Sequence, residues 1–345
     1  MGRRVLVTGL GTFWGGRIAQ RLEQDPGVDV IVGLDRFEPT VPLERTEYVR
    51  SDEGYSILNR IVKATKIDTI VHTFLIVDST IARSRTIHEI NVIGTMNLFA
   101  AASAPGSTVR NVVVKSSTLV YGAGERDPNM FREEHRRTST PRTAVERSLL
   151  EVESYVRDFA EDNPHVTVSL LRYSNVLGPE IRTPLSKALS LPVVPRLFGF
   201  DPRLQFVHED DVIRAMLHVL DHQLPGIYNV AGDGLLPWSE VAAICGKRTV
   251  PLPPFGFRGL IGSPLSRLGI ELTPELIDLL RFGRGVDNRR LQRAGFRYGY
   301  TSAGTVEAYV EAMRLRRLEP AAGTDYHYER DVENFFRHSP AVVRE

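Results

Sequence analysis

The first half of the chain alternates short runs of β-branched residues with longer stretches of helical periodicity, and this alternation restricts the possible folds more than any other feature. Such an order is typical of a parallel sheet covered by helices on both faces, an α/β fold. We expect strands at Val5–Thr8, Val30–Leu34, Thr69–His72, Asn111–Lys115 and Thr167–Leu171, and helices at Gly15–Gln24, Tyr55–Thr65, Thr86–Ala102 and Arg142–Asp162.

Beyond Leu171 this order gives way to proline-bearing loops such as Leu191–Pro195, and a smaller C-terminal lobe is interleaved with the sheet. The further expected elements are a strand at Leu204–Val207 and helices at Asp211–Asp221, Trp238–Cys245, Pro274–Phe282 and Ala303–Arg314. We place the sheet domain at residues 1–172 with returning segments at about 204–230, the substrate lobe at 173–203 and 231–320, and a loosely held tail at 321–345.

The charge balance argues against partners that are recruited by a strong electrostatic field. The 43 basic and 42 acidic residues leave a net charge of +1, so we expect neither nucleic acid nor an anionic lipid surface as a partner. Cys245 is the single cysteine and cannot form an intramolecular disulfide. No uncharged stretch is long enough for a membrane span, although the apolar segment Pro251–Ile270 is typical of a loop or lid. We expect a cytoplasmic protein that binds a small molecule.

A glycine-rich turn joins the first expected strand to the first expected helix, the context that a pyrophosphate-binding turn requires. Asp35 ends the second strand 20 residues after Gly15, where a carboxylate would accept the ribose hydroxyls of an adenosine. That carboxylate would repel a 2′-phosphate, so NAD is favoured over NADP, although Arg36 could pair with such a phosphate. The sequence therefore predicts a Rossmann-type, doubly wound sheet that binds NAD through Asp35, Arg36 and a turn comprising Gly9, Gly11, Thr12, Phe13, Trp14 and Gly15.

Further segments follow in a fixed order at Asn91–Leu98, Ser116–Gly122, Leu171–Pro179, Phe206–Val212 and Tyr228–Gly232. Together with the turn they resemble the extended short-chain dehydrogenase/reductases, the NAD-dependent epimerase/dehydratase family that includes UDP-galactose/UDP-glucose 4-epimerase. The resemblance covers nearly the whole chain. It implies an oxidoreductase or isomerase that uses NAD on a nucleotide sugar, and it makes a homodimer possible.

The resemblance also implies roles for individual residues. Ser117 falls at the catalytic hydroxyl of the family, and Tyr173 lies against the nicotinamide. His208–Asp211 is implied to cap a helix, so we expect no metal site. The other implied positions are Asp52 at the adenine, His72 beside the cofactor, Asn91 bracing a strand, and Thr118, Asn175 and Arg203 toward the substrate.

The Tyr-x-x-x-Lys motif that performs catalysis in the family is missing. With Glu151 as the anchor, its tyrosine and lysine positions fall on Thr143 and Arg147. A threonine hydroxyl is too weak an acid to replace a tyrosine that takes a proton as hydride leaves. Arg147 could hold the nicotinamide ribose, but a guanidinium stays charged and cannot shuttle a proton. Glu146 is a candidate base in a rebuilt site, and pairing with a nearby arginine is the alternative.

A second departure from the family lies in the phosphate-binding turn, where Thr12 replaces the middle glycine. Its side chain would crowd a pyrophosphate unless Gly11 relaxes the backbone, which predicts modest affinity. The alternative is that the Thr12 hydroxyl donates to a phosphate oxygen.

Three functions follow as hypotheses. The first is an NAD-dependent epimerase, dehydratase or reductase-like enzyme that acts on a nucleotide sugar or another hydroxylated metabolite. The second is a non-catalytic NAD sensor or assembly subunit, which the lost tyrosine favours. The third is a reductase of lipid-like or steroid-like substrates, which the apolar segment Pro251–Ile270 suggests.

Overall fold

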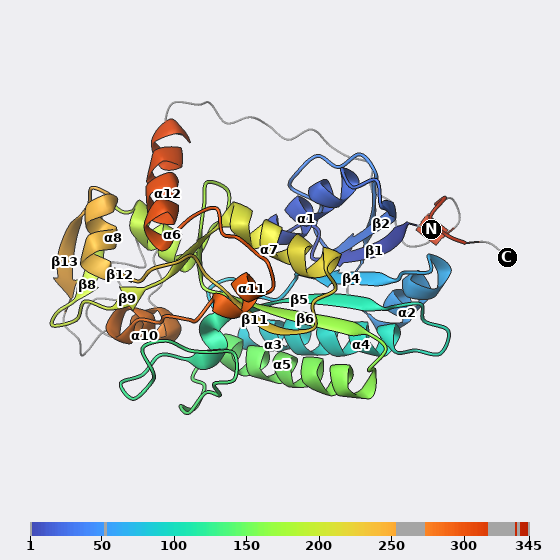
Figure 1. The fold of residues 1–345 in the computed structure, drawn as a ribbon, viewed down its shortest axis with the longest axis horizontal. Coiled ribbons are helices and arrows are strands. Elements are labelled where there is room, and N and C mark those ends of the chain that lie inside the picture. Colours follow the sequence, from blue (N-terminus) through green and yellow to red (C-terminus); the bar gives the residue numbers. More distant parts are fainter. Residues whose placement is uncertain (1, 52–53, 253–272, 317–334, 337–338, 344–345) are drawn as a thin grey trace.

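A seven-stranded parallel sheet forms the centre of the protein, as the computed structural model shows for residues 2–51, 54–252, 273–316, 335–336 and 339–343 (Figure 1). Its strand order is β11-β6-β5-β4-β1-β2-β3, so the chain winds outward on one side of β1 and then on the other. This order confirms the expected Rossmann-type sheet. The strands are β1 Arg3–Thr8, β2 Val28–Asp35, β3 Thr46–Arg50, β4 Thr69–His72, β5 Asn111–Ser117, β6 Thr167–Tyr173 and β11 Gly226–Val230.

Alternating side chains of the strands enter two separate apolar cores, one on each face of the sheet. In β1, Leu6 packs in one core, whereas Val5 and Val7 pack in the other. This two-sided burial explains the near-continuous apolar strands. One face is covered by α1 Phe13–Glu23 and α7 Glu209–Asp221, and the other by α2 Tyr55–Ala64, α3 Ser84–His88, the π-helical turn η1 Glu89–Ile93, α4 Gly94–Ala102 and α5 Ala144–Asp162.

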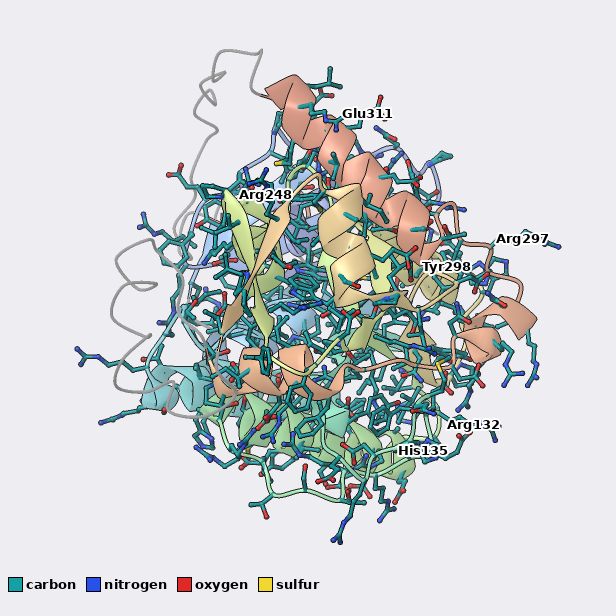
Figure 2. All side chains as sticks on the ribbon, turned by 90° about the vertical axis from the view of Figure 1, so that its left-hand side faces the viewer. Arg132, His135, Arg248, Arg297, Tyr298 and Glu311 are labelled. Atoms are coloured by element: carbon teal, nitrogen blue, oxygen red, sulfur yellow. The ribbon has the colours of Figure 1, made fainter. Side chains whose placement is uncertain are left out.

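Three short strand pairs and a third apolar core build the second lobe. Figure 2 faces this lobe and shows Arg248 and Glu311 at its surface. Its core contains the fully buried Trp238, whose indole Nε1 donates to Pro195 O at 2.8 Å. The elements outside the central sheet are β7 Asn175–Leu177, β8 Val193–Leu197, β9 Arg203–Leu204, β10 Phe206–His208, β12 Leu236–Pro237, β13 Arg248–Leu252, a short 3-10 turn η2 Thr118–Tyr121, α6 Pro184–Ser190, α8 Trp238–Ile244, α10 Pro274–Phe282, α11 Arg289–Arg293 and α12 Ser302–Arg316.

Several expectations about the connecting segments need correction. The edge strand β3 was not expected, and Leu191–Pro195 is no simple loop, because β8 begins at Val193 and pairs with β13. That pairing also takes Pro251 out of the expected lid, whereas residues 253–270 of the lid lie outside the described residues.

The described part of the tail is not loosely held. Phe335 is fully buried, Ala341 O accepts from Arg4 Nη2 at 2.6 Å, and Val343 N donates to Ala64 O at 2.7 Å. These contacts fasten the tail to β1 and the end of α2. Among the described helices, none is long and apolar enough to cross a membrane.

Candidate active site

A cleft of about 1100 Å³ lies at the carboxyl ends of the central strands, between the sheet and the second lobe. The ends of β2 and β5 supply Asp35 and Ser117 to its lining, and α10 of the second lobe supplies Glu275. Open α/β sheets place ligand sites at this edge, beside the strand where the winding reverses. Because β1 and β4 separate β2 from β5, the cleft has a β2 side and a β5 side.

On the β2 side, the glycine-rich turn is held by its own threonine. The Thr12 hydroxyl donates to Gly9 O at 2.7 Å and accepts from Gly15 N at 3.2 Å, so Thr12 caps α1. Its only hydroxyl hydrogen is committed, which contradicts the alternative that Thr12 donates to a phosphate oxygen. The amide of Gly15 is likewise occupied and is not free for an anion.

Close packing explains two of the glycines. A Cβ on Gly9, whose φ is +77°, would lie 2.7 Å from Phe74 N, and a Cβ on Gly15 would lie 2.2 Å from Gly9 O. Neither glycine lines the cleft. Both allow the turn to pack closely against the backbone on the side away from the cleft. The turn residues that line the cleft are Gly11, Thr12, Phe13 and Trp14.

Asp35 ends β2 with its carboxylate held against the turn. Its Oδ2 accepts from Gly11 N at 2.9 Å and its Oδ1 accepts from Phe37 N at 3.0 Å. Burial raises the pKa of Asp35, although these backbone hydrogen bonds oppose the rise. A carboxylate offers about four lone-pair sites, so acceptor capacity remains for a ligand. Arg36 is exposed and also lines the cleft.

On the β5 side, Ser117 and Thr118 begin the turn η2 and line the cleft. The Ser117 hydroxyl accepts from Leu119 N at 3.2 Å, and its hydrogen has no acceptor among the described residues. Asn175 and Tyr173 line the same region. The Tyr173 hydroxyl donates to Val212 O at 3.2 Å, so this residue presents only its ring to the cleft.

The sequence reading missed Lys115, which lies two residues before Ser117 on the same face of β5 and lines the cleft. Its Nζ donates to Leu75 O at 2.7 Å and lies 4.9 Å from the centroid of the Trp14 ring. No carboxylate of the described residues forms an ion pair with it, and burial lowers the pKa of Lys115 to about 7. The available signal was a lysine inside the apolar run of β5, where a charged side chain is costly without a partner.

Arg284 is a second buried cation of the cleft that sequence reasoning missed. Its Nε donates to Gly122 O at 2.8 Å, and its Nη1 donates to Thr118 Oγ1 at 3.4 Å. Both partners are neutral, and burial lowers the pKa of Arg284 to about 10. The sequence carries no signal for this residue, because it follows α10 far from any strand of the sheet.

Helix α5, where the family motif would lie, contributes nothing to the described lining of the cleft. Thr143 is the N-cap of α5, and its hydroxyl accepts from Glu146 N at 3.2 Å. Arg147 is exposed, and within the described part of the chain its side chain donates only to Arg142 O, at 3.5 Å. The roles expected for Thr143 in catalysis and for Arg147 at the ribose therefore find no support in the geometry.

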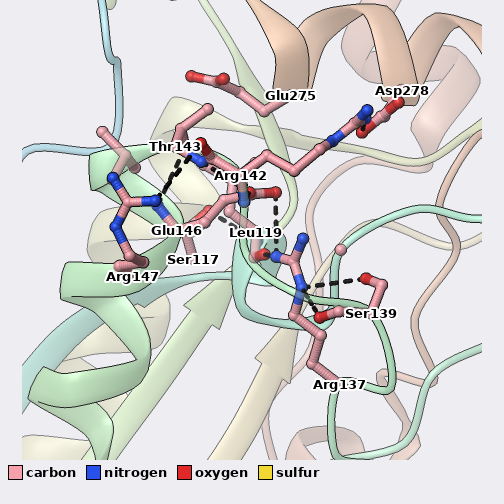
Figure 3. Close-up of polar contacts among 12 residues, drawn as sticks. Ser117, Leu119, Arg137, Ser139, Arg142, Thr143, Glu146, Arg147, Glu275 and Asp278 are labelled. Carbon is pink, nitrogen blue, oxygen red and sulfur yellow. Dashed lines mark hydrogen bonds and ion pairs between the residues drawn. The ribbon is translucent and has the colours of Figure 1, made fainter.

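Glu146 is a structural carboxylate and not a base in a rebuilt site. Figure 3 shows its ion pair with Arg137. The pair spans 2.9 Å, and both side chains are at most 5% exposed. Glu146 also accepts from the backbone N–H groups of Arg142 and Thr143 at 2.7 and 3.2 Å. Although burial raises the pKa of Glu146, these partners outweigh it and hold the pKa below its ordinary value. These contacts tie Glu146 to Arg137 and to the start of α5.

Glu153 is a second possible anchor for the missing motif, besides Glu151. Glu151 is half-exposed and faces His88 at 3.6 Å, whereas Glu153 is buried and pairs with Arg172. Glu153 Oε1 also accepts from the Ser116 hydroxyl at 2.7 Å, which ties α5 to the end of β5. With Glu153 as the anchor, the tyrosine and lysine positions fall on Val145 and Leu149, which are both fully buried. Neither alignment restores the motif.

Two further expected site residues, His72 and Arg203, do not line the cleft. His72 is fully buried, and its ring nitrogens contact Thr8 Oγ1 and Thr95 Oγ1, both at 2.9 Å. Burial lowers the pKa of His72 to about 3, so it is a neutral core residue. The Arg203 side chain points outward from β9 and is exposed, while Asp52 lies outside the described residues.

Asn91 and His208 behave as braces. The Asn91 amide bonds both Ile76 N and Ile76 O, at 2.7 and 2.9 Å, and thereby holds the segment that follows β4. His208 Nδ1 accepts from Asp210 N at 3.2 Å at the start of α7.

A sequence model of the NAD dependent epimerase/dehydratase family matches residues 5–231. The chain belongs to this family.

Other proteins are similar to this chain across both lobes. An uncharacterized protein of Mycobacterium tuberculosis is 34% identical over 324 residues, which cover 92% of this chain and 85% of that protein. The UDP-glucose 4-epimerase of Thermotoga maritima, solved with UDP-glucose, shares the fold with a TM-score of 0.70 at 17% identity, over 92% of this chain and 100% of that one. The UDP-glucuronic acid 4-epimerase of Bacillus cereus, solved with NAD, shares the fold with a TM-score of 0.68 at 17% identity. That match covers 92% of this chain and 99% of the other.

Proposed function

We propose that this member of the epimerase/dehydratase family binds NAD along the cleft and acts on a nucleotide sugar. The observation that carries the proposal is Asp35, whose carboxylate is fixed on Gly11 N beside the turn and keeps acceptor sites for a ribose diol. A negative charge at this place disfavours a 2′-phosphate, so we infer NAD and not NADP.

The bound nicotinamide would supply the hydride acceptor, and residues of this chain would orient the substrate. Ser117 offers a hydroxyl hydrogen to the substrate oxygen on the β5 side, and Asn175 contributes to the substrate region beside it. Lys115 lines the cleft two residues before Ser117 on β5. It is the candidate for the proton transfer that Tyr-x-x-x-Lys performs elsewhere in the family. Its amine can exchange a proton near neutral pH, which neither Thr143 nor Arg147 can do.

The test is to add NAD or NADP to the purified chain, measure thermal stability, and then follow nicotinamide absorbance with a panel of nucleotide sugars. We expect NAD to raise the melting temperature more than NADP, and at least one sugar to change the absorbance or yield an epimer. No thermal shift and no heat of binding with either dinucleotide would contradict the proposal.

A non-catalytic NAD sensor or assembly subunit is the second candidate. Two observations favour it: Thr12 occupies the Gly15 amide, and no described residue of α5 lines the cleft. NAD binding without turnover of any sugar would select this alternative. The lipid-like reductase has no comparable observation, because most of the segment that suggested it lies outside the described residues.

A further inference from the structure

Arg284 is a buried cation of the cleft that forms no ion pair with any described residue. It is 7% exposed, and its only hydrogen-bond acceptors among the described residues are Gly122 O and Thr118 Oγ1. A guanidinium carries five N–H donors, and these two contacts leave Nη2 without an acceptor in the described part of the chain. A buried cation is costly unless an anion accompanies it.

The nearby carboxylates do not fill this role. Glu146 has the largest favourable charge effect on Arg284, but its own charge is balanced by the ion pair with Arg137 at 2.9 Å. Glu275 lines the cleft and acts on Arg284 only at a distance, as does Asp127. The cleft thus keeps an unneutralised guanidinium on its β5 side.

Hydrogen bonds hold the main chain at and just beyond Arg284, while Gly122 O and Thr118 Oγ1 hold its side chain. Arg284 N donates to Arg203 O at 3.1 Å, and the preceding Gly283 has a φ of +72°, which allows the sharp exit from α10. Val286 N donates to Gln205 Oε1 at 2.8 Å just beyond it. A cation held from both sides is preorganised for a ligand and loses little entropy on binding.

The position of Arg284 indicates which part of the ligand it meets. Its Nη1 contacts Thr118, the residue next to Ser117, where the proposed function places the reacting hydroxyl of the sugar. We propose that Arg284 anchors an anion subsite at this reacting end, and that the substrate is an acidic nucleotide sugar with a carboxylate on its hexose. A planar guanidinium fork matches a carboxylate with two parallel hydrogen bonds. This inference rests on the proposed function.

The experiment compares matched sugars with the full chain and saturating NAD in a titration calorimeter. We expect UDP-glucuronate to bind about 10-fold or more tightly than UDP-glucose, since hydrogen bonds to charged groups are worth about that much. Arg284→Gln should weaken UDP-glucuronate roughly 10- to 100-fold and leave UDP-glucose within about twofold. Arg284→Lys keeps the charge but not the two parallel donors of the guanidinium. Its affinity for UDP-glucuronate should lie between those of the unmodified protein and Arg284→Gln.

Arg157→Gln, an exposed arginine of α5 outside the cleft, is the matched control and should change neither affinity. Equal binding of the two sugars to the unmodified protein would overturn the proposal without needing any variant. An equal loss for both sugars in Arg284→Gln would assign Arg284 to the diphosphate and overturn it as well. If neither sugar binds although NAD does, the nucleotide-sugar function itself fails, and the acidic subsite fails with it.

Discussion

The β2 side and the β5 side of the cleft have kept different amounts of the family pattern. On the β2 side, a backbone turn and one carboxylate make the site, and the single departure is Thr12, which forms two hydrogen bonds inside the turn. On the β5 side, Lys115 and Arg284 are buried without carboxylate partners among the described residues, and α5 supplies no cleft residue. A turn built from backbone contacts tolerates sequence change more easily than a site that depends on particular side chains.

The largest expected effect concerns the support of the β5 side. Glu153→Leu should lower the free energy of unfolding by about 3 to 5 kcal/mol, because it leaves the buried Arg172 charge uncompensated. Urea denaturation measures it. Glu151→Leu is the control and should stay within about 0.5 kcal/mol, since Glu151 is half-exposed. Equal effects of the two substitutions would refute the assignment of Glu153 as the glutamate that braces the site.

The next effect concerns cofactor choice on the β2 side. Asp35→Ala should weaken NAD about 10- to 100-fold, because the ribose loses a charged acceptor. NADP binding should weaken less, so the dissociation constant for NADP divided by that for NAD should fall. Fluorescence titration of both dinucleotides measures this ratio. An unchanged ratio would show that Asp35 only holds Gly11 N and does not meet the ribose.

A third prediction concerns the pH dependence that Lys115 imposes. Burial lowers the pKa of Lys115 from 10.5 to about 7, so above pH 7 the unfolded chain binds more protons than the folded one. Below about pH 7 the cost of burying the charged Lys115 amine fully lowers the free energy of unfolding, and this cost falls as pH rises toward 10.5. The free energy of unfolding should therefore rise by about 1 kcal/mol between roughly pH 7.5 and 8.5.

Lys115→Met should remove this gain from denaturation curves. His72, whose charge state Lys115 influences, has its pKa lowered to about 3 by burial and does not titrate in this range. A variant with the same pH slope as the unmodified protein would show that Lys115 remains charged throughout.

The smallest effect concerns Thr12. Thr12→Gly should cost only a few tenths of a kcal/mol, because glycine is itself tolerated as an N-cap. It should also raise NAD affinity severalfold, because Thr12 lines the cleft and its side chain would crowd the pyrophosphate. Thermal shift and titration of the same variant would separate the two effects. Weaker NAD binding in Thr12→Gly would mean that the threonine holds the turn in its binding shape.

Much of the fold and part of the site could be predicted from the sequence. Asp35, Gly11 and Ser117 line the cleft as expected, because strand ends and tight turns have local signals. Arg203 and His72 do not, since whether a side chain of a short strand faces the cleft, the solvent or the core depends on what packs against it. Arg284 reaches the cleft from a segment more than 100 residues beyond Thr118, and no local pattern encodes that approach.

The sequence by itself determined the parallel sheet, the turn and the absence of Tyr-x-x-x-Lys, because these depend on periodicity and residue identity along the chain. The tertiary structure alone decided that Glu153 and not Glu151 braces Arg172, that Thr143 is a helix cap, and that two buried cations line the cleft. The physical reason is that burial and charge compensation arise between segments distant in sequence. They exist only when those segments meet in space.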